Sequence, residues 1–231
     1  MGGRREEILD AALDIADERG LEALSMRALA DRVGVTPMAL YRHVKDKAAL
    51  LDGMVGRLLS ALLPSDAVEN QTWDARLNSL AHACRKVTQR HPWAAHLLFS
   101  RPAVTPDAVR AVDIIYLALI EAGVPDSEVP RLERLISTFV IGFATSEASG
   151  RFAPGALDPR SRRGQLPDSE LPGHTRLGPW LDLPVDFTAE FEADLSDIRR
   201  LVEGAARGRG EVGAAGGRSA TEAVDHSAPP G

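Results

Sequence analysis

The chain has 231 residues, enough for one or two domains with a sizeable core. Its composition, with 44% hydrophobic and 26% charged residues, is typical of a folded soluble protein. The net charge of −6 argues against a protein that coats nucleic acid without discrimination.

The sequence also constrains the compartment. No apolar run reaches the length of a membrane span, and the N-terminal stretch MGGRREEILD lacks the apolar core of a signal peptide. The single cysteine, Cys84, cannot form an internal disulfide and fits a reducing compartment. These features predict a cytoplasmic protein that makes no contact with a membrane.

Four helices are expected in the first sixty residues. Ile8, Ala12 and Ile15 recur at helical spacing, and Gly20 follows as a helix stop. Ser25 is a suitable N-cap for a second helix, which ends at Gly34. The chain restarts at 36–37, where a threonine N-cap precedes a proline at the first helical position, and a fourth helix follows an aspartate cap at position 46.

The second and third of these helices, joined by a Gly-Val turn, form a helix-turn-helix pattern. In that motif the second helix enters the major groove of DNA. Between Ser25 and Lys47 the chain carries five basic and two acidic residues, a local charge of 5 − 2 = +3 on an acidic protein. A small positive patch of this kind suits recognition of one particular anionic shape, although a charged helix face is often merely solvated.

Residues of the third helix divide between an inner and an outer face. If Leu40 and Val44 pack inward, the outer face carries Pro37, Met38, Ala39 and Arg42. Apolar groups there suit thymine methyls, and the arginine can reach a guanine edge or a phosphate. Three further side chains, Tyr41, His43 and Lys47, offer hydrogen bonds to phosphate oxygens.

The stretch ILDAALDIADERGLEALSMRALADRVGVTPMALYRHVKDKAALLDGM resembles the DNA-binding domain of the tetracycline-repressor (TetR) family of bacterial transcriptional regulators. The matching residues are ordered and without gaps: Ala11-Ala12, Gly20, Ser25-Met26-Arg27, Leu29-Ala30, Gly34-Val35, Leu40-Tyr41, His43, Lys47 and Leu50-Leu51. The resemblance implies phosphate contacts at Tyr41, His43 and Lys47. It implies contacts with bases or adjacent backbone at Arg27, Thr36, Pro37, Met38, Ala39 and Arg42.

Beyond Leu63 the apolar spacing is again helical, with stripes over 73–90, 109–120, 132–143 and 187–202 and no competing strand pattern. The fold class is therefore predicted to be all-α. We expect a three-helix helix-turn-helix domain at 1–62 and a helical ligand-binding and dimerisation domain at 63–205. Prolines and glycines predict a flexible loop over 151–185, with some packing around Trp180. The Gly/Ala-rich stretch from Gly204 lacks an apolar stripe, and residues 206–231 are expected to form a disordered tail.

The second domain resembles the tetracycline-repressor C-terminal domain more loosely, through Trp73, Arg101-Pro102 and the segment 137–147. The resemblance implies a pocket for a small effector and a homodimer built from the helices at 125–150 and 186–204. We expect the Phe139/Phe143 and Phe187/Phe191 faces to hold that dimer.

The effector is expected to differ from tetracycline. Leu63, Leu80 and Cys84 stand where drug-binding members carry polar or aromatic contacts, which predicts a largely apolar ligand and no metal. The predicted ligand-binding residues are Leu77, Leu80, Cys84, Leu97, Leu98, Arg101, Tyr116 and Phe139.

Two other function classes fit the sequence less well. An enzyme would need His82 and Cys84 to act together, yet residues two apart on a helix do not share a face, so no catalytic residue and no cofactor is predicted. A redox role for Cys84 is disfavoured by its place on an apolar stripe. The stronger rival is a helical ligand-carrier or interaction protein without operator binding. The main prediction is a regulator that leaves a palindromic operator in double-stranded DNA when a small molecule binds.

Overall fold

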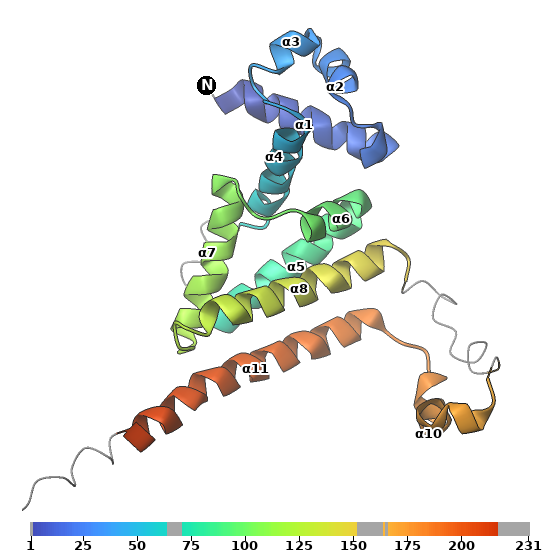
Figure 1. Cartoon of the computed structure of the whole chain (residues 1–231), viewed down its shortest axis with the longest axis vertical. Helices are drawn as coiled ribbons and strands as arrows, with labels where there is room; N and C mark the ends of the chain where they lie inside the picture. Colours follow the sequence, from blue (N-terminus) through green and yellow to red (C-terminus); the bar gives the residue numbers. More distant parts are fainter. Residues whose placement is uncertain (1, 64–70, 152–163, 165, 217–231) are drawn as a thin grey trace, which may run out of the picture.

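The computed structural model describes residues 2–63, 71–151, 164 and 166–216, and every regular element in those ranges is a helix (Figure 1). In chain order the elements are α1 (Gly2–Arg19), η1 (Leu21–Ala23), α2 (Met26–Val33), α3 (Pro37–Leu40), α4 (Lys47–Ser60), α5 (Trp73–Arg90), α6 (Pro92–Ser100), α7 (Pro106–Glu121), α8 (Val129–Ala148), η3 (Asp168–Glu170), α10 (Pro172–Leu181) and α11 (Phe187–Gly216). The predicted all-α fold class is confirmed.

The boundaries of the N-terminal helices follow from local chemistry. Ser25, Thr36 and Asp46 each accept a hydrogen bond from the backbone N–H three residues later, at 3.1, 3.2 and 2.7 Å. Each bond satisfies one of the donors that a helix start leaves unpaired. Gly20 and Gly34 have φ values of 80° and 74°, the left-handed region in which glycine ends a helix at little cost. The predicted caps and stops are confirmed.

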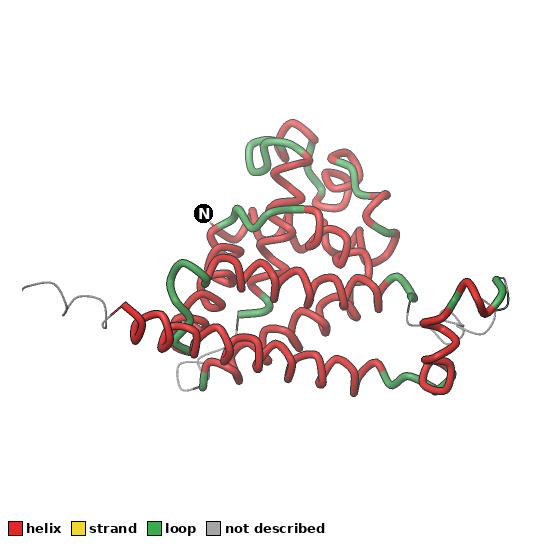
Figure 2. The backbone as a smooth tube through the Cα atoms, turned by 60° about the horizontal axis from the view of Figure 1, so that its bottom comes forward, coloured by secondary structure: helices red, strands yellow, loops and turns green. Residues whose placement is uncertain are grey.

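Two hydrophobic clusters form the core. The first joins α1, α2, α3 and α4 to Ala94, Leu97 and Leu98 of α6. The second joins α5, α7, α8 and the first part of α11. The helix α6 thus lies beyond the expected boundary at 62 yet completes the core of the N-terminal helices. Figures 1 and 2 show the α1–α4 unit at one end of the molecule and α11 running beside α8 at the other.

Three polar contacts join α1 and α4 to the segment that contains α6. Arg101, which follows α6, donates hydrogen bonds to Asp52 on α4 at 2.6 and 2.8 Å. Asp17 on α1 contacts the His91 ring at 2.6 Å and accepts from the indole of Trp93 at 2.7 Å. His91 lies between α5 and α6.

The C-terminal third differs from the sequence prediction in two ways. Where a flexible loop was predicted over 151–185, the described part contains η3 and α10, and Trp180 is 67% exposed rather than packed. Residues 152–163 and 165 of the predicted loop, and residues 217–231 of the predicted tail, lie outside the described residues. The helix α11 also continues to Gly216, past the predicted start of a disordered tail at 206, because alanine, arginine and glutamate extend a helix already docked on the body.

The predicted dimer face also needs correction. Phe143 and Phe191 are buried within one chain, and their ring centroids lie 4.8 Å apart. This happens because α11 packs on α8 of its own chain. The outward surfaces of these helices carry other apolar residues, Leu135 on α8 and Leu201 on α11, which are 41% and 43% exposed.

Candidate nucleic-acid interface and effector cavity

The helix-turn-helix presents an open face because its third helix is anchored from beneath. Leu40 and Val44 are buried in the first core cluster. The next residues around the helix therefore point outward, and Met38 and Tyr41 are 74% and 46% exposed. A large apolar side chain at the tip of a short capped helix, exposed this far, is suited to contact with a partner rather than to the core.

Four cations beside this helix have no acidic partner among the described residues. Within the described part of the chain, no acidic side chain lies within ion-pair distance of Arg27, Arg42, Lys45 or Lys47. Arg32 differs, because its guanidinium is held by Glu18 at 2.5 and 3.0 Å. These four cations are therefore available to bind an external anion such as a DNA phosphate.

All nine residues predicted to contact DNA lie on α2, on α3 and its following turn, or at the caps and first turns of α3 and α4. Eight are exposed and Ala39 is half-buried. The hydroxyl of Thr36 accepts from the backbone N–H of Ala39 at 3.2 Å, which caps α3 and leaves the O–H free to donate.

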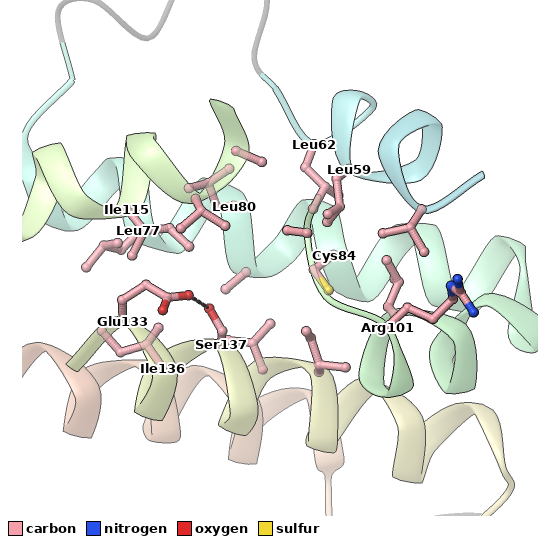
Figure 3. A pocket seen from close by; sticks show the side chains of 18 residues that line it. Leu59, Leu62, Leu77, Leu80, Cys84, Arg101, Ile115, Glu133, Ile136 and Ser137 are labelled. Atoms are coloured by element: carbon pink, nitrogen blue, oxygen red, sulfur yellow. Dashed lines mark hydrogen bonds between the residues drawn. The ribbon is translucent and has the colours of Figure 1, made fainter. Parts of the chain in front are cut away.

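A cavity of about 190 Å³ lies between α4, α5, α7 and α8 (Figure 3). It is lined by Val55, Leu59, Leu62, Leu77, Leu80, Ala81, Cys84, Leu98, Arg101, Ala103, Ala111, Val112, Ile115, Glu133, Ile136, Ser137, Val140 and Ile141. A partly open, mainly apolar space with few polar groups is typical of a small-molecule site.

The cavity contains five of the eight predicted ligand-binding residues: Leu77, Leu80, Cys84, Leu98 and Arg101. Leu97, Tyr116 and Phe139 are not among its lining residues. Leu97 packs in the first core cluster, and the two aromatic residues pack against the second. Successive positions of a helix face different directions, so a stripe read from sequence can be displaced by one residue.

Several parts of the wall fall outside the predicted set. On α7 they are Ala111, Val112 and Ile115, one turn or less from the predicted Tyr116. Val55 and Leu59 of α4 and Leu62 just after it also line the cavity, although the sequence places them in the DNA-binding domain. On α8 the prediction missed Glu133 and Ser137. A signal existed, because Glu133 is in helical register with the buried Ile136 and Val140, where an acidic residue is out of place.

The polar groups of the cavity are few. Ser137 donates a hydrogen bond to Glu133 at 2.7 Å, and the Arg101 guanidinium is bound to Asp52 and to the carbonyl of Ala48 at 3.1 Å. Burial raises the pKa of the Cys84 thiol to about 11. Cys84 is therefore an uncharged thiol at neutral pH, in agreement with its prediction as a packed or pocket-lining residue.

Among the described residues, no three histidine, cysteine, aspartate or glutamate side chains are placed to share a metal ion. None of the described helices has the length and apolar character needed to cross a membrane.

Comparison with protein families identifies both halves of the chain. Residues 8–54 match the model described as "Bacterial regulatory proteins, tetR family". Residues 65–195, more than half of the chain, match "Tetracyclin repressor-like, C-terminal domain". The chain belongs to the TetR family. The predicted resemblance is thereby confirmed in both domains.

Individual proteins of the TetR family are also similar to this chain in sequence. The chain is 32% identical over 165 residues to the HTH-type transcriptional repressor DrrR1 of Streptomyces coeruleorubidus, covering 70% of this chain and 61% of the relative. It spans about three fifths of the length of the first curated relatives that it matches.

Two solved structures are similar in fold and sequence. ActR of Streptomyces coelicolor in complex with actinorhodin superposes with a TM-score of 0.72 at 26% identity, covering 87% of this chain and 97% of that one. BioQ with its double-stranded DNA operator superposes with a TM-score of 0.53 at 27% identity, covering 63% of this chain and 86% of that one.

Proposed function

We propose that the protein is a DNA-binding transcriptional regulator that responds to a small molecule, and specifically a repressor that leaves a palindromic operator when the cavity is occupied. The proposal rests on the exposed surface of the α2–α3 unit. Its buried Leu40 and Val44 fix a short helix whose outer face combines exposed Met38 and Tyr41 with cations that have no acidic partner among the described residues. Such a face suits the major groove and its flanking phosphates.

The relatives support each part of the proposal. DrrR1 is named a transcriptional repressor, BioQ was solved with its DNA operator, and ActR was solved with the small molecule actinorhodin. Together they support a protein of this family that binds DNA at one end and a small molecule at the other.

The helix α4 offers a route between the two sites. It begins at Lys47, beside the proposed phosphate contacts, and its later residues Val55 and Leu59 line the cavity. A ligand that fits only one position of α4 draws the population toward that position, by no more than its differential affinity for the two states. Arg101 strengthens this route, since it lines the cavity and holds Asp52 on the same helix.

The remaining parts of the proposal follow from this role. The protein acts as a homodimer in the bacterial cytoplasm, where its operator lies, and it has no catalytic activity and needs no cofactor. The effector is a largely apolar molecule that binds without a metal. The alternative, a helical ligand carrier without operator binding, does not account for the exposed face of α3.

Footprinting on the DNA that surrounds the protein's own gene tests the proposal. The wild type should protect a near-palindromic segment at nanomolar concentration, and Tyr41→Ala should weaken that protection. The control Lys86→Ala removes an exposed cation from α5 and should leave the footprint unchanged. A carrier would give no footprint with any of the three proteins, and that result would reject the regulator proposal.

A further inference from the structure

An acidic side chain in the wall of the cavity points to the chemistry of its ligand. Glu133 is 8% exposed, and Figure 3 shows its carboxyl group directed into the cavity beside Ser137. Within the described part of the chain its hydrogen-bond partner is the Ser137 hydroxyl at 2.7 Å, and no lysine, arginine or histidine lies within ion-pair distance. This group is therefore buried without a counter-ion from the described residues.

The other polar groups of the cavity wall do not neutralise the charge of Glu133. The Arg101 guanidinium is engaged by Asp52 at 2.6 and 2.8 Å, and by a backbone carbonyl of the same helix. The thiol of Cys84 stays uncharged at neutral pH, because burial raises its pKa to about 11. The rest of the lining is almost wholly aliphatic.

A buried carboxylate without a partner is costly, and a hydrogen-bonded cation offsets much of that cost. A ligand can supply that cation, since a charge-assisted hydrogen bond to a desolvated carboxylate is among the stronger polar contacts. An anionic ligand would meet repulsion at the same place. A neutral apolar ligand would leave the acidic group as it is.

We propose that the ligand of this cavity is a hydrophobic amine, with a compact apolar body between Leu77, Leu80 and Ile115 and a protonated nitrogen bound by Glu133. Ser137 positions the carboxylate for that contact through its hydrogen bond. The inference rests on the proposed function only in taking this cavity as the effector site.

Calorimetry on the purified full-length protein, without DNA, tests the inference with matched probes. Two apolar bodies are used, adamantane and a linear decyl chain, each as the amine, the alcohol and the carboxylate. At neutral pH the amine of at least one body should bind about tenfold more tightly than its alcohol, as expected for one charge-assisted hydrogen bond. The carboxylate should bind more weakly than either.

Two variants identify the residue responsible. Glu133→Gln keeps the size of the side chain and should reduce amine binding to the level of the alcohol, without weakening the alcohol. Glu190→Gln removes the same charge from the exposed surface of α11 and should leave the amine preference intact. If Glu133→Gln does not fold, Glu133→Asp can replace it, since it keeps the charge on a side chain that is one methylene shorter. This variant should weaken binding of the amine more than binding of the alcohol.

Three results would overturn the inference: equal binding of amine and alcohol to the wild type, an amine preference that survives in Glu133→Gln or is undiminished in Glu133→Asp, or no binding of either amine. Because no DNA is present, these results are independent of the operator footprint. A missing footprint with a preserved amine preference would reject the regulator and keep the amine site.

Discussion

At the scale of single residues, two exposed cations of the helix-turn-helix should have different roles. Arg42 follows α3, where we expect it to reach base edges, whereas Lys47 is the first residue of α4, at the flank of the motif. Arg42→Ala should therefore cost about 1–3 kcal/mol on the operator and less on random DNA, if the arginine contacts a guanine. Lys47→Ala should weaken both kinds of DNA alike and lower the salt dependence by about one counter-ion.

Fluorescence titrations of both variants at several salt concentrations measure this difference. Equal losses on operator and random DNA for Arg42→Ala would show that it too contacts only the backbone.

A second residue-scale prediction concerns the ion pair between Arg85 and Glu147. The two side chains make two hydrogen bonds, at 2.7 and 2.8 Å, and the guanidinium lies 5.0 Å from the centre of the Phe191 ring. The Arg85 hydrogen bonds hold the pKa of Glu147 below its ordinary value. Since Arg85 is largely buried, Glu147→Gln should cost about 1–3 kcal/mol of unfolding free energy at pH 7.

The sign of the pH dependence follows from the lowered pKa. A group with a depressed folded-state pKa contributes its full stability above its unfolded pKa, and that stability is lost as the pH falls through the folded value. The difference between wild type and Glu147→Gln should therefore be constant near neutral pH and shrink below the ordinary carboxyl pKa of 4.5. Urea titrations from pH 7 to about pH 3 measure it, and a gap that widens on acidification would contradict the assignment.

At the scale of elements, the contact between α4 and α7 depends on a glycine. A Cβ at Gly56 would lie 2.2 Å from the hydroxyl oxygen of Thr105 and 3.0 Å from its Cβ. The Thr105 hydroxyl caps α7 by accepting from the N–H of Ala108 at 3.3 Å, so it cannot turn away freely. Gly56→Ala should then separate the helices and cost about 1–3 kcal/mol.

Thermal unfolding of Gly56→Ala measures that cost. The matched control is Gly3→Ala on α1, where the added methyl has nothing within 4 Å and the melting temperature should hold or rise slightly. Adding Thr105→Ala to Gly56→Ala should cost less than Thr105→Ala costs in the wild type. Strict additivity of the two changes would argue against the close approach.

At the scale of the whole molecule, the proposed operator contact requires symmetry. One short recognition helix reads only a few base pairs, so two copies related by a two-fold axis should bind half-sites about 34–36 Å apart, one helical turn. The exposed Leu135 on α8 and Leu201 on α11 lie on the helices proposed to form the dimer. Leu135→Arg should give a folded monomer with a large loss of operator affinity.

Sedimentation at micromolar concentration, together with circular dichroism, separates dissociation from unfolding. Leu177→Arg places the same charge on the exposed surface of α10 and should leave the dimer intact. A wild-type protein that sediments as a monomer while keeping full operator affinity would rule out the symmetric arrangement.

The sequence by itself determined the features that depend on neighbouring residues. The caps at Ser25, Thr36 and Asp46, and the stops at Gly20 and Gly34, are each set by one side chain or one φ angle within a single turn of helix. For the same reason the inward position of Leu40, and with it the outward face of α3, followed from helical spacing alone.

Only the tertiary structure decided what depends on the packing of distant helices. It turned Leu98 toward the cavity and Leu97 into the core, and it buried the Phe143 and Phe191 rings together instead of leaving them for a second chain. It also brought Glu133 to the wall of an apolar cavity. A helical period defines a stripe, but the direction of that stripe is set by where neighbouring helices dock, and that docking depends on contacts between residues far apart in the chain.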